Sequence, residues 1–561
     1  MTHDSSLSRR KWLGLVSLPT LTASIGSGLL AENASAADMP AGGAAGNDLG
    51  ARVYNVRDFG ATGDGKTLDT AAVQAAIDAC HNDQGGTVLV PAGVFVIGTV
   101  EMKSNVTLRI TATGKLLGSA DGKQYRAAEA VPLRGDSTLG DGNVGLIFAV
   151  NAVNITIEGP GMIDGQGAQF RDPVRGTPPP SGRGGDQRPY HLLFYRCQNL
   201  RIRDLDLVAS AYHSIRIIQS QFVWASGLHI YNRVNHNNDG FHFISSQYVH
   251  VTDCDVQSQD DACALFGSCQ FVTITNSTFS TRWSVFRFGG GTARNITISN
   301  CVIYEAYGCP IKMHCGPGSL FEDISFSNLV MHNVTGPIYI GLTRRRGQSG
   351  LPDEPPGIVR NISFNAIHAT VVEPVPLPNV SFGSTYNPGE IRSCIALDGI
   401  AGVLTKIDFN DVHITFPGGG TQEQAAMRDV PEGGGEYFQS GVLPAYALFA
   451  RNAGGLTLHN VRFEIAASDL RPAIVFDGVQ DVSAVGLNVQ GDAKAESVLR
   501  FAKVRDAMFT ATRLLTPADV FLQVEGTDNG GIIMDGGDFS KAATAMAFKA
   551  GANEKAVQLR T

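Results

Sequence analysis

Three aspartates set one repeat apart are the residues of this sequence best suited to chemistry. The stretch "SQDDACALFG" (258–267) places Asp260 and Asp261 side by side before an apolar run, and "HNNDGFHF" places Asp239 in a similar setting 21 residues earlier. Carboxylates gathered in one patch repel, so at least one of them should have a raised pKa. A protonated carboxyl group can donate to a leaving oxygen while an ionised neighbour activates water, which is the chemistry of glycoside hydrolysis.

The same three aspartates fit two other roles. Aspartates often satisfy backbone amides in turns, and a cluster of carboxylates can hold a calcium ion. The acid/base role also requires a bend or bulge at the pair, because adjacent residues of a strand point to opposite faces. We expect the acid/base role, with no bound metal and no other cofactor.

A degenerate repeat supplies the elements that position these acids. Stretches such as "CQNLRIRDLDL", "SQYVHVTDCDV" and "CQFVTITNSTF" each contain a polar turn, a branched apolar strand with period two, Asn or Asp, and another strand. The successive spacings are 24, 25, 23, 24 and 28 residues for the anchors Asn199, Val223, Tyr248, Phe271, Asn295 and Asp323. Weaker copies begin at Asn154, Asn361, Lys406, Leu456 and Val482.

Short strands at this period, with no helix between them, predict a solenoid. Leucine-rich repeats have a similar length, but the leucine ladder and the helical segment that they need are missing. The sequence therefore predicts an all-β fold, a right-handed parallel β-helix whose coils stack about 4.8 Å apart. Residues one coil apart then lie above one another, which would bring Asp239 to the pair Asp260–Asp261.

The coils need a cap at each open end, because a bare sheet edge invites pairing with other chains. The stretch "DTAAVQAAIDAC" (69–80) predicts a short amphipathic helix at the N-terminal end, with Val73, Ile77 and Cys80 near one face. We expect one β-helix catalytic domain over 52–540 and a C-terminal tail or cap over 541–561. Long insertions rich in Pro and Gly are predicted to form either walls of a binding site or loops without a role, near 172–185, 343–357 and 417–435.

The N-terminus is typical of an export signal. Paired arginines in "SRRKWLG" (8–14) precede a moderately apolar run over 13–30, and "ASA" (34–36) is a small-residue cleavage pattern. These features predict a twin-arginine signal over 1–36 and a flexible linker over 37–51. The expected partner is the twin-arginine export machinery, and the expected location is periplasmic or secreted, without a stable membrane anchor. An uncleaved anchor or chance basic residues are the alternatives.

The composition excludes some classes of protein. Hydrophobic residues make up 43% of the 561 residues and charged residues 17%, as in a globular protein. A net charge of −8 gives no reason to expect nucleic acid as a partner. The nine cysteines show no CxxC spacing, so we expect buried free thiols.

Several stretches together resemble glycoside hydrolase family 28, the polygalacturonases. They are "YNVRDFGATGDGKTLDTAAVQAAIDAC", "IEGPGMIDGQG", "RPYHLLFYRCQNLRIRDLDL" and the two aspartate motifs, and the resemblance covers roughly 52–530. It implies that Asp260 is the general acid, and that Asp239 and Asp261 activate water with inversion at the anomeric carbon. It also implies a polysaccharide or oligosaccharide substrate.

Two motifs depart from the family pattern, and both departures concern the substrate. The Arg-Ile-Lys motif is "GCPIKMHCG" here, which keeps Lys312 but has Pro310 in place of arginine. The Gly-His-Gly region reads "STRWSVFRFGGG", with Trp283 near the histidine position. The candidate substrate-binding residues are Lys312, Asn238, His242, Trp283, Arg282, Arg287 and His314, and the basic run Arg344–Arg346 is either a solvated turn or an attraction for acidic glycans.

The sequence thus favours an exported, inverting glycoside hydrolase that acts on an acidic plant cell-wall polysaccharide. Galacturonan and rhamnogalacturonan are the expected pectic substrates. One alternative is a polysaccharide lyase, which would need a basic residue to abstract a proton. The other is a β-helix protein that binds glycans without catalysis.

Overall fold

The computed structural model describes residues 49–128, 144–170, 188–235, 237–344, 354–373, 394–433 and 440–560. All of them belong to one unit, Asp48–Thr561. The expected export signal, nearly all of the expected linker and the insertion 172–185 lie outside the described residues. Within the described residues, no helix is long and apolar enough to cross a membrane.

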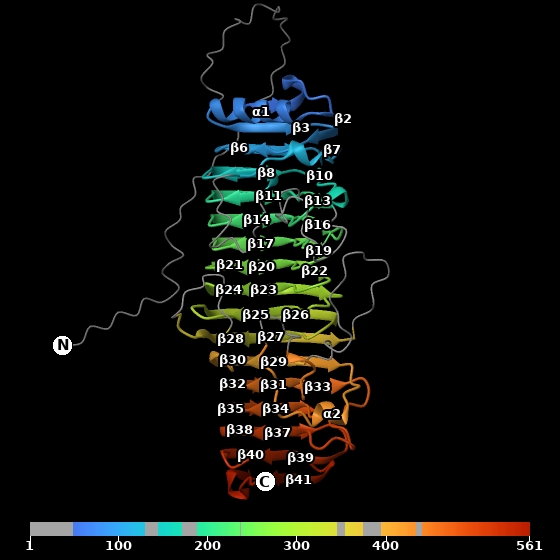
Figure 1. Ribbon diagram of the computed structural model, residues 1–561, viewed down its shortest axis with the longest axis vertical. Helices are drawn as coiled ribbons and strands as arrows, with labels where there is room; N and C mark the ends of the chain where they lie inside the picture. Colours follow the sequence, from blue (N-terminus) through green and yellow to red (C-terminus); the bar gives the residue numbers. More distant parts are fainter. Residues whose placement is uncertain are drawn as a thin grey trace, which may run out of the picture. The chain divides into compact units, whose positions relative to one another are not determined.

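The described chain is a right-handed parallel β-helix, so the predicted fold class is confirmed. Each coil runs through a strand of one sheet of 15 strands, then through two successive faces of a second sheet of 27 strands (Figure 1). We call the 15-stranded sheet the short sheet and the other the long sheet. Every pairing between named strands is parallel, from coil to coil, which is the pattern that the repeat predicts.

The strands of each face follow the coils in order. The short sheet contains β5 (Val100–Glu101), β8 (Gly145–Val150), β11 (Tyr190–Tyr195), β14 (Ile215–Ile218), β17 (Phe241–Ile244), β20 (Cys263–Phe266), β23 (Phe286–Gly289), β25 (Ile311–Cys315), β27 (Ile338–Leu342), β29 (Ile395–Asp398), β31 (Leu448–Arg451), β34 (Ile474–Asp477), β37 (Leu499–Ala502), β39 (Ala518–Glu525) and β41 (Ala542–Lys549). The first face of the long sheet contains β1 (Val53–Asn55), β3 (Gly86–Val90), β6 (Val106–Ile110), β9 (Val153–Glu158), β12 (Gln198–Arg203), β15 (Gln221–Ser226), β18 (Gln247–Thr252), β21 (Gln270–Thr275), β32 (Ala453–His459), β35 (Gln480–Val485) and β42 (Val557–Arg560).

The second face of the long sheet contains β2 (Asp64–Leu68), β4 (Gly93–Ile97), β7 (Gly114–Gly118), β10 (Met162–Asp164), β13 (Asp206–Val208), β16 (His229–Asn232), β19 (Asp255–Ser258), β22 (Thr278–Thr281), β33 (Arg462–Ile465) and β36 (Asn488–Val489). Six long strands bend across both faces: β24 (Thr292–Tyr304), β26 (Leu320–Val334), β28 (Gly357–Val371), β30 (Gly402–Phe416), β38 (Arg505–Leu514) and β40 (Gly530–Asp538). Short 3-10 turns lie at Val56–Phe59, Gly122–Gln124, Gly167–Phe170 and Glu554–Ala556.

Alternating side chains explain why these segments form coils. In the second half of β18 and of β21 every second residue is buried, and the inward Val and Ile side chains join one continuous apolar core. Burial of such side chains contributes about 1.5–3 kcal/mol each, which is the main force that holds the coils together.

Asn and Asp mark the bends of the coil. Asn154, Asn199 and Asn295 have positive φ, a conformation that Asn tolerates better than most residues. The amides of successive bends also bond to each other, as from Asn199 Nδ2 to Asn154 Oδ1 at 2.9 Å. One anchor of the predicted repeat is displaced: the bend lies at Phe222, so Val223 pairs with Leu200 rather than with Asn199.

The ends of the described β-helix differ. Helix α1 (Thr70–Asn82) covers the N-terminal coils, with Val73, Ile77 and Cys80 buried, as the sequence predicts (Figure 1). At the other end, β41 pairs with β39 and β42 pairs with β40. Parallel pairing therefore continues through Arg560.

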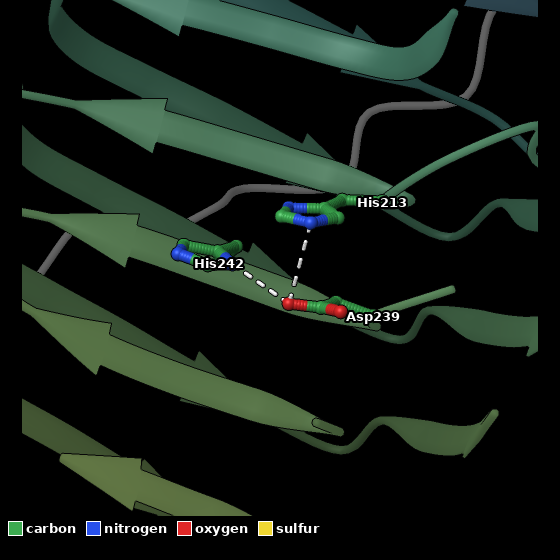
Figure 2. A group of neighbouring side chains, drawn as sticks. All are labelled: His213, Asp239 and His242. Atoms are coloured by element: carbon green, nitrogen blue, oxygen red, sulfur yellow. Dashed lines mark hydrogen bonds and ion pairs between the residues drawn. The ribbon is translucent and has the colours of Figure 1, made fainter. Parts of the chain in front are cut away.

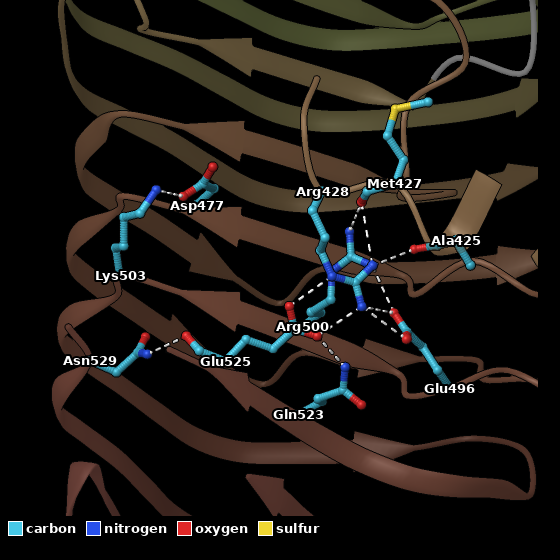
Figure 3. Close-up of polar contacts among 10 residues, drawn as sticks. All are labelled: Ala425, Met427, Arg428, Asp477, Glu496, Arg500, Lys503, Gln523, Glu525 and Asn529. Atoms are coloured by element: carbon cyan, nitrogen blue, oxygen red, sulfur yellow. Dashed lines mark hydrogen bonds and ion pairs between the residues drawn. The ribbon is translucent and has the colours of Figure 1, made fainter. Parts of the chain in front are cut away.

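The third long insertion lies against the short sheet. Its helix α2 (Gln422–Ala425) begins with a capping box at Thr421. Arg500 of β37 is 3% exposed and donates to the carbonyls of Ala425 and Met427 and to Glu496 (Figure 3). Arg428 of the insertion pairs in turn with Glu496 and Glu525.

Arg451 of β31 holds the same insertion at a second point. Its guanidinium forms a two-pronged pair with Asp398, at 2.9 and 2.6 Å, and donates to the carbonyls of Val430 and Pro431. Arg451 and Asp398 are 6% and 4% exposed. A buried charge is stable only when it is paired, so these contacts tie the insertion firmly to the sheet.

All nine cysteines are buried and unbridged, which confirms the expected free thiols. Burial raises the pKa of Cys197 to about 11 and that of Cys254 to about 12.

Candidate active site

The strand register stacks the three aspartates. Phe241 pairs with Cys263, so the coil at this point is 22 residues long. Asp261 therefore lies one coil from Asp239, at the same position two residues before its strand, and Asp260 lies next to it. The pair occupies a bend between β19 and β20, which supplies the change of direction that the sequence requires.

Asp239 is almost completely enclosed. It is 4% exposed, and its Oδ2 lies 2.7 Å from Nδ1 of His242 and 3.6 Å from Nε2 of His213 (Figure 2). Burial raises the pKa of Asp239 well above its usual value, and the charges of Asp260 and Asp261 raise it further. The guanidinium groups of Arg216 and Arg188 oppose this shift.

His242 is held between two aromatic rings. It stacks on His213 with 4.4 Å between ring centroids and 10° between planes, and on Phe266 with 4.9 Å and 29°. Tyr212 continues the stack beyond His213, at 4.4 Å. Burial lowers the pKa of His242 well below its usual value, and the charge of Arg216 lowers it further. Burial also lowers the pKa of His213 well below its usual value. Both imidazoles are therefore neutral near neutral pH.

The same three side chains also have the composition of a metal site. Their ligand atoms all lie within 4.8 Å of one another. An imidazole nitrogen, however, binds a metal along its lone pair, which lies in the plane of the ring. The rings of His213 and His242 are stacked and nearly parallel, so one ion cannot lie in both planes. The arrangement suits hydrogen bonding to Asp239 better than chelation.

The other two carboxyl groups differ in exposure. Asp261 is 7% exposed, whereas Asp260 is half-buried and so reaches solvent more easily. Asp260 accepts hydrogen bonds from Nδ2 of Asn237 at 3.2 Å and from the amide of Asp261 at 2.9 Å. Thr281 and Ser258 donate to the carbonyl of Asp260 and hold the bend.

A row of basic side chains follows the outward side of the short sheet. The register pairs Arg216 with His242, His242 with Ala264, Ala264 with Arg287, and Arg287 with Lys312. Arg287 lies one coil and Lys312 two coils from Ala264, so the row places positive charge roughly 5 Å and 10 Å along the β-helix from the Asp260–Asp261 coil.

The predicted substrate residues are grouped around the end of this row. Nζ of Lys312 lies 4.5 Å from the ring centroid of Trp283, and Lys312 is fully buried there. The guanidinium of Arg282 lies 5.5 Å from the ring centroid of Tyr307. Arg287 and His314 are half-buried on β23 and β25. The structure thus brings Lys312, Trp283, Arg287 and His314 to neighbouring coils, while Arg282 lies in the loop beside them.

Asn238 has a different place from the one expected. It is fully buried, and its Oδ1 accepts from the amides of Val234 and Asn235 while its Nδ2 donates to the carbonyls of Ser210 and Tyr212. Every hydrogen bond that this amide makes in the structure goes to backbone. Asn238 therefore holds the loop that carries Asp239, which corrects the expected contact with substrate.

Only the first residue of the basic run near 344 belongs to the described chain. Arg344 is exposed, and its amide donates to Glu432 at 2.9 Å. Arg345 and Arg346 lie outside the described residues.

Sequence reasoning missed His213, Arg216 and Arg188. A signal for Arg216 is present, because "SIRI", "GFHF", "VFRF" and "PIKM" all place one basic residue between two apolar ones. Aligning the short-sheet strands on that pattern reveals the whole row. His213 has no such signal, since its coil is 26 residues long rather than 22.

Two clusters of buried apolar side chains also lie on the short sheet. One includes Leu193 and Ile218 and extends to Ile244 of β17 and Phe266 of β20, so it runs beside the basic row. The other includes Tyr339 and Phe449, with Val430 of the 417–435 insertion packed against it.

A hollow of about 520 Å³ lies on the long sheet, lined by residues of β28, β30, β32 and β35 such as Asp408 and Ser483. It contains none of the predicted site residues.

Three comparisons relate this chain to known proteins. The family model described as glycosyl hydrolases family 28 matches residues 80–381, just over half of the chain. A polygalacturonase from Persea americana is 27% identical over 374 residues, which cover 64% of this chain and 76% of that protein. An exo-poly-alpha-D-galacturonosidase from Dickeya chrysanthemi is 31% identical over 253 residues, 38% of this chain and 41% of that protein, so the match spans less than half of that relative. A family 28 exopolygalacturonase structure from Yersinia enterocolitica aligns with a TM-score of 0.55 at 20% identity, over 77% of this chain and 78% of that one.

Proposed function

Because this chain belongs to family 28 of the glycosyl hydrolases, we propose that it hydrolyses glycosidic bonds in an acidic plant cell-wall polysaccharide, galacturonan or rhamnogalacturonan. The observation that carries the proposal is the strand register that stacks Asp261 on Asp239 one coil apart, with Asp260 beside them. Carboxyl groups stacked in this way titrate apart, and one proton is shared among neighbours that would otherwise all be ionised.

The exposure of the three acids supports a division of roles. Asp260, the most accessible, is suited to give its proton to the glycosidic oxygen. Asp239 and Asp261 are enclosed and suited to take a proton from water as its oxygen bonds to the anomeric carbon. The C–O bond to the leaving sugar breaks, the proton from Asp260 stays on that sugar, and the other proton returns through solvent. The family resemblance implies inversion at the anomeric carbon.

The basic row supports an acidic substrate. Lys312 and Arg287 lie on strands that follow the carboxylate coils, so a sugar carboxylate next to the cleaved bond can meet positive charge there. The names of two of the relatives refer to galacturonan, which is the same class of substrate.

The test is release of reducing ends from a panel of pectic polysaccharides by wild type and Asp260→Asn. A matched control is Asp253→Asn, an exposed bend residue in the preceding loop whose positive φ suits asparagine. Release by wild type and the control, abolished in Asp260→Asn, is the expected result. Proton NMR of the first product gives the anomer, and a retained anomer would contradict inversion.

Ultraviolet absorbance tests the lyase alternative, and polymer binding tests the glycan-binding alternative. A lyase leaves an unsaturated sugar, so growth of ultraviolet absorbance with turnover would contradict hydrolysis. A glycan-binding protein would bind the polymer equally well as wild type and as Asp260→Asn, with no release from either.

The name of the relative from Dickeya chrysanthemi refers to action at chain ends, which supports the same mode of action here. Chain-end action predicts release of short products from the start, with little early loss of viscosity. A rapid fall of viscosity would mean that internal bonds are cut.

We also propose export through the twin-arginine pathway, on the basis of Arg9, Arg10 and the pattern ending at Ala36. Replacing both arginines with lysine is expected to leave uncleaved precursor inside the cell. Normal export of that variant would contradict this route.

A further inference from the structure

A stack of rings lies beside Asp239. His242 is 2% exposed and stacked on both faces, and its Nδ1 makes the shortest contact to the carboxylate, at 2.7 Å. Tyr212, His213 and Phe266 complete the stack. A ring clamped in this way has little freedom to rotate away from Oδ2 of Asp239 (Figure 2).

We propose that His242 is a positioning residue for the hydrolytic reaction, and that it presents a neutral Nδ1–H to Oδ2 of Asp239 and so keeps this carboxylate ionised and aimed. This inference rests on the proposed function. The general base must be ionised to accept a proton from water, yet its surroundings favour the protonated form.

The role of His242 depends on which of its two ring nitrogens bears the hydrogen. An ionised carboxylate only accepts hydrogen bonds, so Nδ1 of His242 bears the hydrogen and Nε2 is a bare acceptor. Nε2 is buried and has no hydrogen-bond partner in the described chain. If Asp239 gained a proton, it would donate to Nδ1, and the imidazole hydrogen would move to Nε2. That would leave a buried N–H without a partner, which is rarer and less favourable than an unpaired acceptor.

Charged groups from neighbouring coils act on Asp239 in opposite directions. Asp260 and Asp261, from the loop before β20, oppose ionisation. Arg216 of β14 and Arg188, which precedes β11, favour it. His213, in the loop before β14, is neutral and lies farther from Oδ2, at 3.6 Å. His242 thus stabilises the carboxylate of Asp239 with an uncharged hydrogen-bond donor. A further cation in the same place would first have to lose its hydration, which costs free energy.

The experiment compares two substitutions of His242. In His242→Phe the stack remains but the donor is lost, whereas in His242→Asn the amide nitrogen takes the place of Nδ1. Loss of a hydrogen bond to a charged group is expected to shift the acidic limb of kcat/KM upward by about one to two pH units in His242→Phe. His242→Asn should keep the limb near its wild-type position, and so should His213→Phe, which retains the stacked ring.

Equal loss of rate in both His242 variants, with the acidic limb unmoved, would overturn the proposal and leave a packing role. Melting curves show whether each variant is folded. If His242→Phe is not folded, His242→Met takes its place as the variant without the donor.

A second readout needs no turnover. An aspartate whose folded-state pKa is raised stabilises the protein below its unfolded pKa, and this stability is lost as pH rises through the folded pKa. Losing the donor raises the folded pKa of Asp239 further, so Tm should fall more steeply in His242→Phe than in His242→Asn as pH rises above the usual pKa of aspartate. An equal fall would contradict the inference. A wild type without turnover would contradict the proposed function but leave this comparison decisive.

Discussion

Replacing Asp260 with asparagine tests the division of labour among the acids. The side chain keeps its size, and its oxygen can still accept from the amide of Asp261, now 2.9 Å from Oδ1. Its new amide group faces Nδ2 of Asn237, which is also a donor, so one hydrogen bond is lost. That loss costs about 1 kcal/mol of folding free energy, too little to unfold the domain.

The expected effect on catalysis is much larger. General acid catalysis contributes about 10²–10⁴-fold, so kcat on the polysaccharide should fall by that factor, equal to about 3–5 kcal/mol of activation free energy. The charge of Asp260 also helps to raise the pKa of Asp239, after the larger effect of burial. Removing it lowers that pKa, so the acidic limb of the residual activity should move to lower pH.

The assay uses two substrates that differ in leaving group. An aryl glycoside with an activated leaving group needs no proton, so Asp260→Asn should lose little rate on it. Asp261→Asn lacks a group that activates water and should lose a similar factor on both substrates. Equal losses by Asp260→Asn on polymer and aryl glycoside would refute the assignment of Asp260 as the acid.

Three further predictions concern binding, stability and the thiols. Lys312→Met should lower kcat/KM about 10- to 150-fold on de-esterified substrate and little on the methyl ester, because a charge-assisted hydrogen bond is worth about 1.5–3 kcal/mol; equal losses on both would exclude a carboxylate contact. Arg451→Met leaves Asp398 buried without its partner and should destabilise the protein by about 3–5 kcal/mol, measured by urea unfolding. The double variant Arg451→Met/Asp398→Leu should recover most of that loss, and no recovery would mean that the contacts with the insertion dominate. The nine buried thiols should react with a thiol reagent at pH 8 only after denaturation, and fast reaction of the native protein would contradict their burial.

The strand pattern made the fold predictable. Alternation of apolar residues and Asn or Asp at the bends are local properties, repeated in every coil, so they are visible without knowledge of the neighbours. The same pattern located the capping helix with its buried face of Val73, Ile77 and Cys80. The pattern was less precise for single residues: the bend lies at Phe222, one residue before the expected anchor Val223.

The site was predictable in part, for the same reason. Asp239 and Asp261 could be paired because their coil has 22 residues and no insertion. His213 could not, because its coil contains extra loop residues between β16 and β17 that conceal the register. For Asn238 the motif predicted a contact with substrate. Only the structure shows that both the oxygen and the nitrogen of its side-chain amide form hydrogen bonds with backbone groups.

The sequence alone determined that the chain winds into parallel coils and that Asp239, Asp260 and Asp261 can converge on one side of them. Those conclusions need only periods and spacings, which are carried by residues close together in the chain. The tertiary structure decided what those groups can do. Whether Asp239 is ionised depends on its burial, on the stacked His242 and His213, and on Arg216 and Arg188 from earlier coils. Electric fields and exclusion of water arise only when distant coils pack together, so no spacing in the sequence can reveal them.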